Sequence, residues 1–248
     1  MQRYFIELSY DGTKYHGWQI QPNAPTVQET IEKALSILLH DTISLTGAGR
    51  TDTGVHASYF VAHFDHLETN LDQRENLVFK LNGILPDDIA IHAISKVDQE
   101  MHARFSARYR QYIYTIRKTK PLFNRSFCYY HYGNLDIKMM NNACEILMEY
   151  TDFTSFSKLH TDVKTNNCTI SDALWTEHED GYDFQITADR FLRNMVRSIV
   201  GTMLEIGTGK LDLESFRRII EAKDRGKAGT SAPARGLFLV DIGYEGID

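Results

Sequence analysis

Cysteines and long apolar runs are scarce in this sequence. Its three cysteines are odd in number and form no C-x-x-C pair, standing at Cys128, Cys144 and Cys168. Neither a disulfide framework nor a structural zinc site is therefore predicted, and this usage suits a reducing, cytoplasmic location. No run of about 18 apolar residues occurs, so no transmembrane helix is expected. The N-terminus alternates like a strand and lacks the apolar core of a signal peptide.

An excess of positive charge is also lacking. The chain has 27 lysines and arginines against 33 acidic residues, which gives a formal net charge of −6. That average argues mildly against a nucleic-acid partner, but the distribution of charge is more informative. With 248 residues, 42% of them hydrophobic, the chain can form a substantial core as one large domain or two small ones.

Apolar periodicity in the first half predicts alternating strands and helices. Strands are expected at residues 3–10, 42–48, 57–65 and 87–97, and helices at 25–40 and 71–85. Thr26 and Glu29 have the spacing of a capping box at the start of the first helix. The resulting order, β-α-β-β-α-β, is the ferredoxin-like pattern.

The second half repeats this plan loosely. Strands are expected at residues 110–116, 126–132 and 236–244, with a hairpin over 169–188 that turns at Asp180-Gly181. Helices are expected at 136–150, 191–207 and 212–223. We predict an α+β protein with two halves, residues 1–106 and 107–248, and a cleft between them.

Positive charge is concentrated in residues 101–135. This window has no acidic residue and seven arginines and lysines, a local charge of +7, interleaved with nine phenylalanines and tyrosines. Arginines contact phosphates and aromatic rings stack on unpaired bases, so the mixture favours binding of single-stranded or looped RNA. The alternative is an exposed strand with solvated arginines and core aromatics.

A second group of arginines lies in the predicted helix at 191–207 and just before it. Arg190, Arg193 and Arg197 have i, i+3 and i+7 spacing, so on one continuous helix they share a face. A stripe that faces solvent is one interpretation. Arg197 has apolar neighbours, however, and an arginine in such surroundings normally pairs with a carboxylate or phosphate.

Three other motifs do not support the chemistry that they suggest. YDGT at 10–13 lacks the nucleophilic carboxylate of aspartyl-phosphate phosphatases, because Ser9 stands two residues before Asp11. GTGK at 207–210 lacks both the first glycine and the final Ser or Thr of a phosphate loop. GAGRTDTG has the wrong spacing for a dinucleotide fingerprint. We predict neither a metal site nor a bound cofactor.

The stretch GAGRTDTGVHA, residues 47–57, is the strongest candidate for a functional loop. Its glycines allow positive φ and close approach by a ligand. Asp52 can be a local capping group. Alternatively, a carboxylate with an arginine partner, such as Arg50, serves as a nucleophile or base at a sugar carbon. Such pairing lowers the pKa of the aspartate and keeps it ionised.

The same stretch resembles the signature of the tRNA pseudouridine synthase A family, which usually has Ala where Thr53 stands. YDGTKYHGWQIQP and TVQETIEKAL resemble the N-terminal block of that family, and HARFSARYRQYIYTI its central block. DFTSF, FLRNMVRSIVG and APARGLFLVDIGY resemble its C-terminal blocks. The blocks occur in family order over almost the whole chain.

The resemblance implies an enzyme that converts uridine to pseudouridine in the anticodon stem-loop of tRNAs, at tRNA positions 38, 39 and 40. In this reaction the C1′–N1 bond breaks, the uracil turns, and C1′ rejoins it at C5, with no cofactor. The implied fold is two ferredoxin-like halves that share an extended, mostly antiparallel sheet around a central cleft. The implied assembly is a homodimer. A tRNA-binding module without catalysis and a uracil-releasing hydrolase are the alternative functions.

The resemblance also assigns roles to residues. The catalytic aspartate corresponds to Asp52, which either attacks C1′ or removes the C2′ proton. Tyr112 would stack on the extruded uracil, Arg197 would pair with Asp52, and Arg50 would position the RNA or the loop. The remaining arginines expected to bind RNA phosphates are Arg104, Arg108, Arg110 and Arg193. The chain departs from the family at Cys168, where a basic residue is common, and at Arg193-Asn194.

Overall fold

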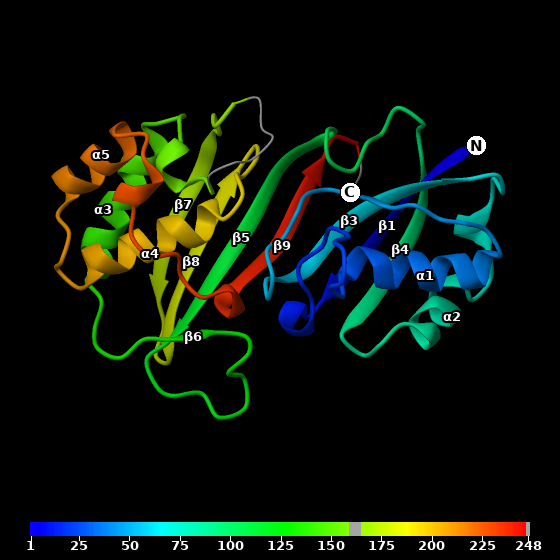
Figure 1. The fold of residues 1–248 in the computed structure, drawn as a ribbon, viewed down its shortest axis with the longest axis horizontal. Helices are drawn as coiled ribbons and strands as arrows, with labels where there is room; N and C mark the ends of the chain where they lie inside the picture. The colour runs from blue at the N-terminus through cyan, green and yellow to red at the C-terminus, as the bar shows by residue number, and fades with distance from the viewer. Residues whose placement is uncertain (159–164, 247–248) are drawn as a thin grey trace. The chain divides into compact units, whose positions relative to one another are not determined.

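A computed structural model describes residues 1–158 and 165–246, which divide into two compact units. The first unit comprises Met1–Arg108 and Leu239–Asp248, and the second comprises Tyr109–Phe238. The described residues form an α+β fold with five α-helices (Figure 1). Residues from Leu239 onward, which the sequence analysis places in the C-terminal half, belong to the first unit. The predicted domain limits at 106 and 107 stay a prediction.

The sheet of the first unit is built around β1 (Gln2–Tyr10). It pairs antiparallel with β3 (His56–His66) on one side and with β4 (Ile89–Val97) on the other. The strand order is β4-β1-β3-β9, with β9 at Leu237–Tyr244. The predicted strand at 42–48 is reduced to the two-residue β2 (Thr46–Gly47), which pairs with β3. The element order from β1 to β4 agrees with the predicted β-α-β-β-α-β pattern.

Strand register in this sheet brings three connections to the same end. Tyr10, the last residue of β1, lies opposite Ala57 near the start of β3 and opposite Ile89 at the start of β4. The segment that follows β1 therefore emerges beside the segments that precede β3 and β4. This arrangement follows from antiparallel pairing, in which the end of one strand meets the beginning of its neighbour.

Two helices, α1 (Val27–Leu39) and α2 (Leu77–Ile84), lie side by side in the first unit (Figure 1). The Thr26 side chain accepts the Glu29 N–H at the start of α1, as the capping-box spacing predicts. The predicted helix at 71–85 is wrong in its first part, because a 3-10 turn at Leu71–Gln73 precedes α2. Asn76 has φ 60° and interrupts the helical path there, since asparagine tolerates the left-handed conformation.

The second unit has a sheet in the order β5-β8-β7. The strands β5 (Ala107–Arg117), β8 (Gly181–Ala188) and β7 (Ile170–Glu177) pair antiparallel, and the β7–β8 hairpin turns at the predicted place. The predicted strand at 126–132 is reduced to the two-residue β6 (Tyr129–Tyr130), which pairs parallel with β5. The described residues therefore contain a mixture of parallel and antiparallel pairs.

Three helices gather beside β7 and β8 in this unit (Figure 1): α3 (Ile137–Met148), α4 (Met195–Gly207) and α5 (Leu213–Glu221). The core between helices and sheet includes Trp175, whose ring stacks on Phe184 at 4.8 Å. The indole N–H of Trp175 also lies 3.2 Å from the Met203 sulfur. Among all the helices in the described residues, none is long and apolar enough to span a membrane.

The start of α4 corrects one prediction about the arginines. The helix begins at Met195 and not at Phe191, because Asn194 has φ 66° and lies in the left-handed region. Arg190 and Arg193 therefore precede the helix, and only Arg197 lies on it. The predicted common helical face of the three arginines is wrong.

Candidate active site

Asp52 lies in the loop between β2 and β3 of the first unit. Its side chain is partly exposed, Arg50 is exposed, and Thr51 between them is buried. The Asp52 carbonyl oxygen accepts the N–H of Val55 at 3.1 Å, which closes a four-residue turn. Gly54 occupies the third position of this turn with φ +76°, a conformation that favours glycine there. The turn fixes the main chain directly after the Asp52 carboxylate.

The segment that follows β1 holds this loop from the other side. The N–H of Trp18 donates to the Thr51 carbonyl oxygen at 3.4 Å, and the N–H of Gly54 donates to the Tyr15 carbonyl oxygen at 3.3 Å. The buried hydroxyls of Tyr10 and Thr51 are 2.9 Å apart and share a hydrogen bond. The main chain is thus anchored both before and after Asp52.

Close approach of the two segments requires a glycine at position 17. Gly17 has φ +86°, and a Cβ built there would lie 2.2 Å from the Thr51 carbonyl oxygen. Any side chain would push the two segments apart. The glycines of the loop 47–57 predict positive φ there, but the role of residues 10–18 was not predicted. The signal for it was the glycine that directly precedes Trp18 in YDGTKYHGW.

In the second unit, Tyr112 and Tyr114 lie on β5 two residues apart, so their side chains share a face of the strand. Tyr114 is fully buried, and its hydroxyl donates to the Pro233 carbonyl oxygen at 2.9 Å. Burial raises the pKa of Tyr114 well above its ordinary value. Tyr112 is only half-buried, and its ring meets Phe191 edge-on, with ring centroids 5.1 Å apart. Tyr112 is therefore the more accessible of the two rings.

Arg197 lies in the first turn of α4 and is partly exposed. Its Nε donates to the Ala232 carbonyl oxygen at 2.8 Å, and the Ala232 N–H donates back to the Arg197 carbonyl oxygen at 2.9 Å. Asn194 adds a bond from its side-chain amide to the Ser231 hydroxyl at 2.7 Å. These contacts hold both the main chain of Arg197 and the Nε atom of its guanidinium. Residues 231 and 232 were not predicted from the sequence as partners of this segment.

The four arginines expected to bind phosphates are divided between the units. Arg104 and Arg108 belong to the first unit, where Arg104 lies over the Phe105 ring and Arg108 pairs with Glu245. Arg110 and Arg193 belong to the second, where Arg110 donates to the Asp189 carbonyl oxygen at 2.9 Å. Arg104, Arg108 and Arg193 are exposed and Arg110 is half-buried. Each unit therefore presents its own arginines.

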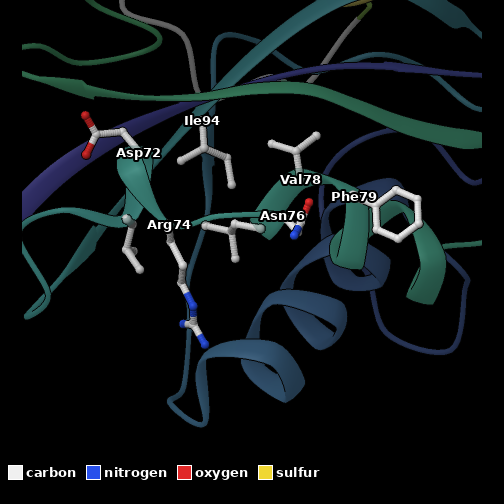
Figure 2. Close-up of a pocket in the computed structure, with 8 residues that line it drawn as sticks. Asp72, Arg74, Asn76, Val78, Phe79 and Ile94 are labelled. Carbon is white, nitrogen blue, oxygen red and sulfur yellow. The ribbon is translucent and has the colours of Figure 1, made fainter.

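A small cavity of about 160 Å³ lies in the first unit beside α2 (Figure 2). Its lining includes apolar residues, such as Leu77 and Ile94, and the charged residues Asp72 and Arg74. None of the predicted site residues lines it. We therefore place the candidate site on the loop that carries Asp52 and not at this cavity.

The fold and the site define an α+β protein with a partly exposed carboxylate on a loop held by main-chain hydrogen bonds. Residues 8–106 and 143–245 match the family described as tRNA pseudouridine synthase. The chain is similar to the protein named tRNA pseudouridine synthase A from Bacteroides thetaiotaomicron, at 58% identity over 98% of this chain and 91% of the relative. It is also similar to the proteins of that name from Parabacteroides distasonis, at 56% over 98% and 96%, and from Bacillus subtilis, at 42% over 96% and 97%. The chain belongs to the tRNA pseudouridine synthase family.

Substitution Gly17→Ala tests the contact between the two segments. The added methyl group meets the Thr51 carbonyl oxygen, so we expect the free energy of unfolding to fall by more than the about 1–2 kcal/mol of backbone strain alone. We also expect faster hydrogen exchange at the Gly54 amide. Gly133→Ala is the matched control, because Gly133 also has positive φ, +98°, but has nothing within 4 Å of its built Cβ. The free energy of unfolding is measured in urea. An equal fall in this free energy and an equal change in Gly54 exchange in both variants would contradict the proposed contact.

Proposed function

We propose that this protein is a tRNA pseudouridine synthase that isomerises uridine to pseudouridine at positions 38, 39 and 40 of the tRNA anticodon stem-loop. The observation that carries the proposal is Asp52 within GAGRTDTGVHA, on a loop anchored at Thr51 and Gly54. The similarity to proteins named tRNA pseudouridine synthase A over almost the whole chain supports it. The positions within the tRNA rest on the family resemblance.

The reaction needs one carboxylate at the ribose. Breaking the C1′–N1 bond leaves the electron pair on the uracil, and Asp52 either forms a bond to C1′ or takes the C2′ proton. After the uracil turns, C5 bonds to C1′ as the Asp52–C1′ bond breaks or, on the other route, as the proton returns to C2′. The C5 proton then leaves, and N1 gains a proton. Atoms and electrons balance without a redox partner, and the proposal includes no cofactor. Anchoring of the loop would supply the orientation that such a carboxylate requires.

Tyr112 and Arg197 are assigned to the same uridine in this proposal. The accessible ring of Tyr112 suits stacking on an extruded base, whereas the buried Tyr114 does not. A guanidinium has five N–H donors, so an Arg197 anchored through Nε can also pair with the Asp52 carboxylate and keep it ionised. Arg50, exposed on the same loop as Asp52, is assigned to positioning the RNA.

The finer features of the family belong to the same proposal. They are two ferredoxin-like halves that share one extended sheet around a cleft, a homodimer, and a cytoplasmic location. Binding of the tRNA is assigned to phosphate contacts by Arg104, Arg108, Arg110 and Arg193. The exposure of three of these side chains supports that assignment.

Release of tritium from uridine C5 distinguishes this function from its rivals. We expect the protein to release tritium from an unmodified tRNA transcript labelled at C5, without free uracil, because the C5 proton is lost while the base stays on the ribose. Free uracil would indicate the hydrolase. Binding of the tRNA with neither product would indicate a module without catalysis. Transcripts with cytidine at positions 38, 39 and 40 should lose the release, and undiminished release would contradict the proposed positions.

Salt dependence of binding tests the assignment of Arg193 to a phosphate. For Arg193→Gln we expect weaker tRNA binding and a slope of log affinity against log salt that is smaller in magnitude by about 1. Arg217→Gln is the control, because Arg217 lies in α5 of the same unit and pairs with Glu149 at 2.8 Å. Its slope should equal that of the unmodified protein. The same change of slope in both variants would point to net charge alone.

A further inference from the structure

Asp88, the residue directly before β4, collects three hydrogen bonds from the segment that follows β1. The Tyr15 hydroxyl donates to its Oδ1 at 2.6 Å, and the Lys14 ammonium donates to its Oδ2 at 3.0 Å. The Asp88 carbonyl oxygen accepts the N–H of Asp11 at 2.9 Å. Both the side chain and the main chain of Asp88 therefore hold residues 11–15 against the start of β4.

The bond between Asp88 and Tyr15, at 2.6 Å, is the shortest of these contacts. Only 10% of the Asp88 side chain and 6% of Tyr15 are exposed. Burial alone would raise the pKa of Asp88, but the hydrogen bonds from Tyr15 and Lys14 outweigh it, so the pKa lies below its usual value. Burial, together with the carboxylate, raises the pKa of Tyr15, which stays a donor. A short bond from a hydroxyl to a charged oxygen is stronger than one between neutral groups.

Tyr15 connects Asp88 to the candidate catalytic loop. Its hydroxyl is bound to Asp88, while its carbonyl oxygen accepts the Gly54 N–H at 3.3 Å. Gly54 lies within the turn that the Asp52 carbonyl oxygen closes with Val55. Asp88 is thus linked to Asp52 through the Tyr15 side chain and two main-chain hydrogen bonds, one between Gly54 and Tyr15 and one between Val55 and Asp52.

We propose that Asp88 is a positioning residue for the reaction: by fixing Tyr15, it holds the Asp52–Val55 turn where the Asp52 carboxylate meets the ribose. The inference rests on the proposed function, in which Asp52 is the catalytic residue. Displacement of a reacting group by about 1 Å can lower a rate by about 100-fold. Loss of Asp88 should therefore act on the rate of the chemical step and much less on binding of tRNA.

The test measures kcat and KM for C5-tritium release by the full chain. For Asp88→Ala and Tyr15→Phe we expect kcat to fall by about 10- to 100-fold, with KM for tRNA within about 2-fold of that of the unmodified protein. Asp88→Asn keeps an oxygen that can accept from the Tyr15 hydroxyl, so it should recover most of the lost kcat. The double variant Tyr15→Phe with Asp88→Ala should be no slower than the slower single variant, because both changes break the same bond.

Tyr4→Phe is the matched control for a purely structural effect. Tyr4 is fully buried in the same unit, and its hydroxyl donates to the Glu68 carbonyl oxygen at 2.8 Å and accepts the Leu71 N–H at 3.3 Å. Tyr4→Phe and Tyr15→Phe should lower the melting temperature to a similar degree. Only Tyr15→Phe should lower kcat.

Three results would overturn the inference. They are a kcat near that of the unmodified protein for Tyr15→Phe, equal kcat losses for Tyr4→Phe and Tyr15→Phe, and no recovery in Asp88→Asn relative to Asp88→Ala. If Asp88→Ala does not fold, Tyr15→Phe and Asp88→Asn still decide the matter. Failure of the proposed function is distinguishable, because the unmodified protein would then release no tritium. Faster hydrogen exchange at Gly54 in Tyr15→Phe would still report the structural link, and unchanged exchange would contradict it.

Discussion

The hydrogen bonds between residues 10–18 and the loop before β3 are the constraint on which the site depends. A loop that carries a charged residue would otherwise be mobile, because neither Asp52 nor Arg50 is buried. The anchor is firm because Trp18 is itself buried and stacks on Phe60 of β3 at 4.1 Å. Core packing in the sheet thereby fixes a main-chain segment, and that segment fixes the loop. The main chain of the loop is thus held by hydrogen bonds, while Arg50 is exposed and Asp52 is partly exposed.

Antiparallel register explains why this arrangement forms. Because Tyr10 lies opposite both Ala57 and Ile89, the three segments that hold Asp52 come together at one end of the first unit's sheet. The segment after β1 contributes the carbonyl oxygen of Tyr15 as an acceptor. The loop before β3 contributes the Thr51 carbonyl oxygen and the Asp52 carboxylate, and the segment before β4 contributes the Asp88 carboxylate, which binds Tyr15. In the proposed mechanism these two acidic side chains have different roles. The Asp88 carboxylate, whose side chain is 10% exposed, accepts hydrogen bonds from Tyr15 and Lys14. Asp52 is partly exposed, which suits the proposed action on a substrate.

Much of the fold could be predicted from the sequence because its signals are local. Alternation of apolar residues identified β1, β4 and the β7–β8 hairpin, and the capping spacing at Thr26 identified the start of α1. The errors in the helix starts arose where an asparagine takes a left-handed conformation. Asn76 and Asn194 delay the starts of α2 and α4, and no periodicity of apolar residues reports such a residue, since neighbouring side chains remain compatible with a helix.

The candidate site, too, could be predicted only in part from the sequence. The residue types in GAGRTDTGVHA and the family resemblance were visible in the sequence, but the contacts that hold the loop were not. Tyr15 and Asp88 are 73 residues apart in the chain, and only the paired strands reveal that they meet. Gly17 can be read from the sequence, but the need for a glycine there cannot. That need comes from the Thr51 carbonyl oxygen, which lies on another segment. Interactions of this kind depend on register, which single-sequence patterns do not specify.

The most direct test of the central claim is the single-turnover rate of C5-tritium release by the Asp52→Asn variant, with tRNA binding measured on the same preparation. The substitution preserves the size of the side chain and all the main-chain hydrogen bonds of the loop, but removes the carboxylate. The account predicts a rate lower by at least about 1,000-fold with tRNA affinity essentially unchanged. A rate within about 10-fold of that of the unmodified protein would contradict the assignment of Asp52 as the catalytic residue.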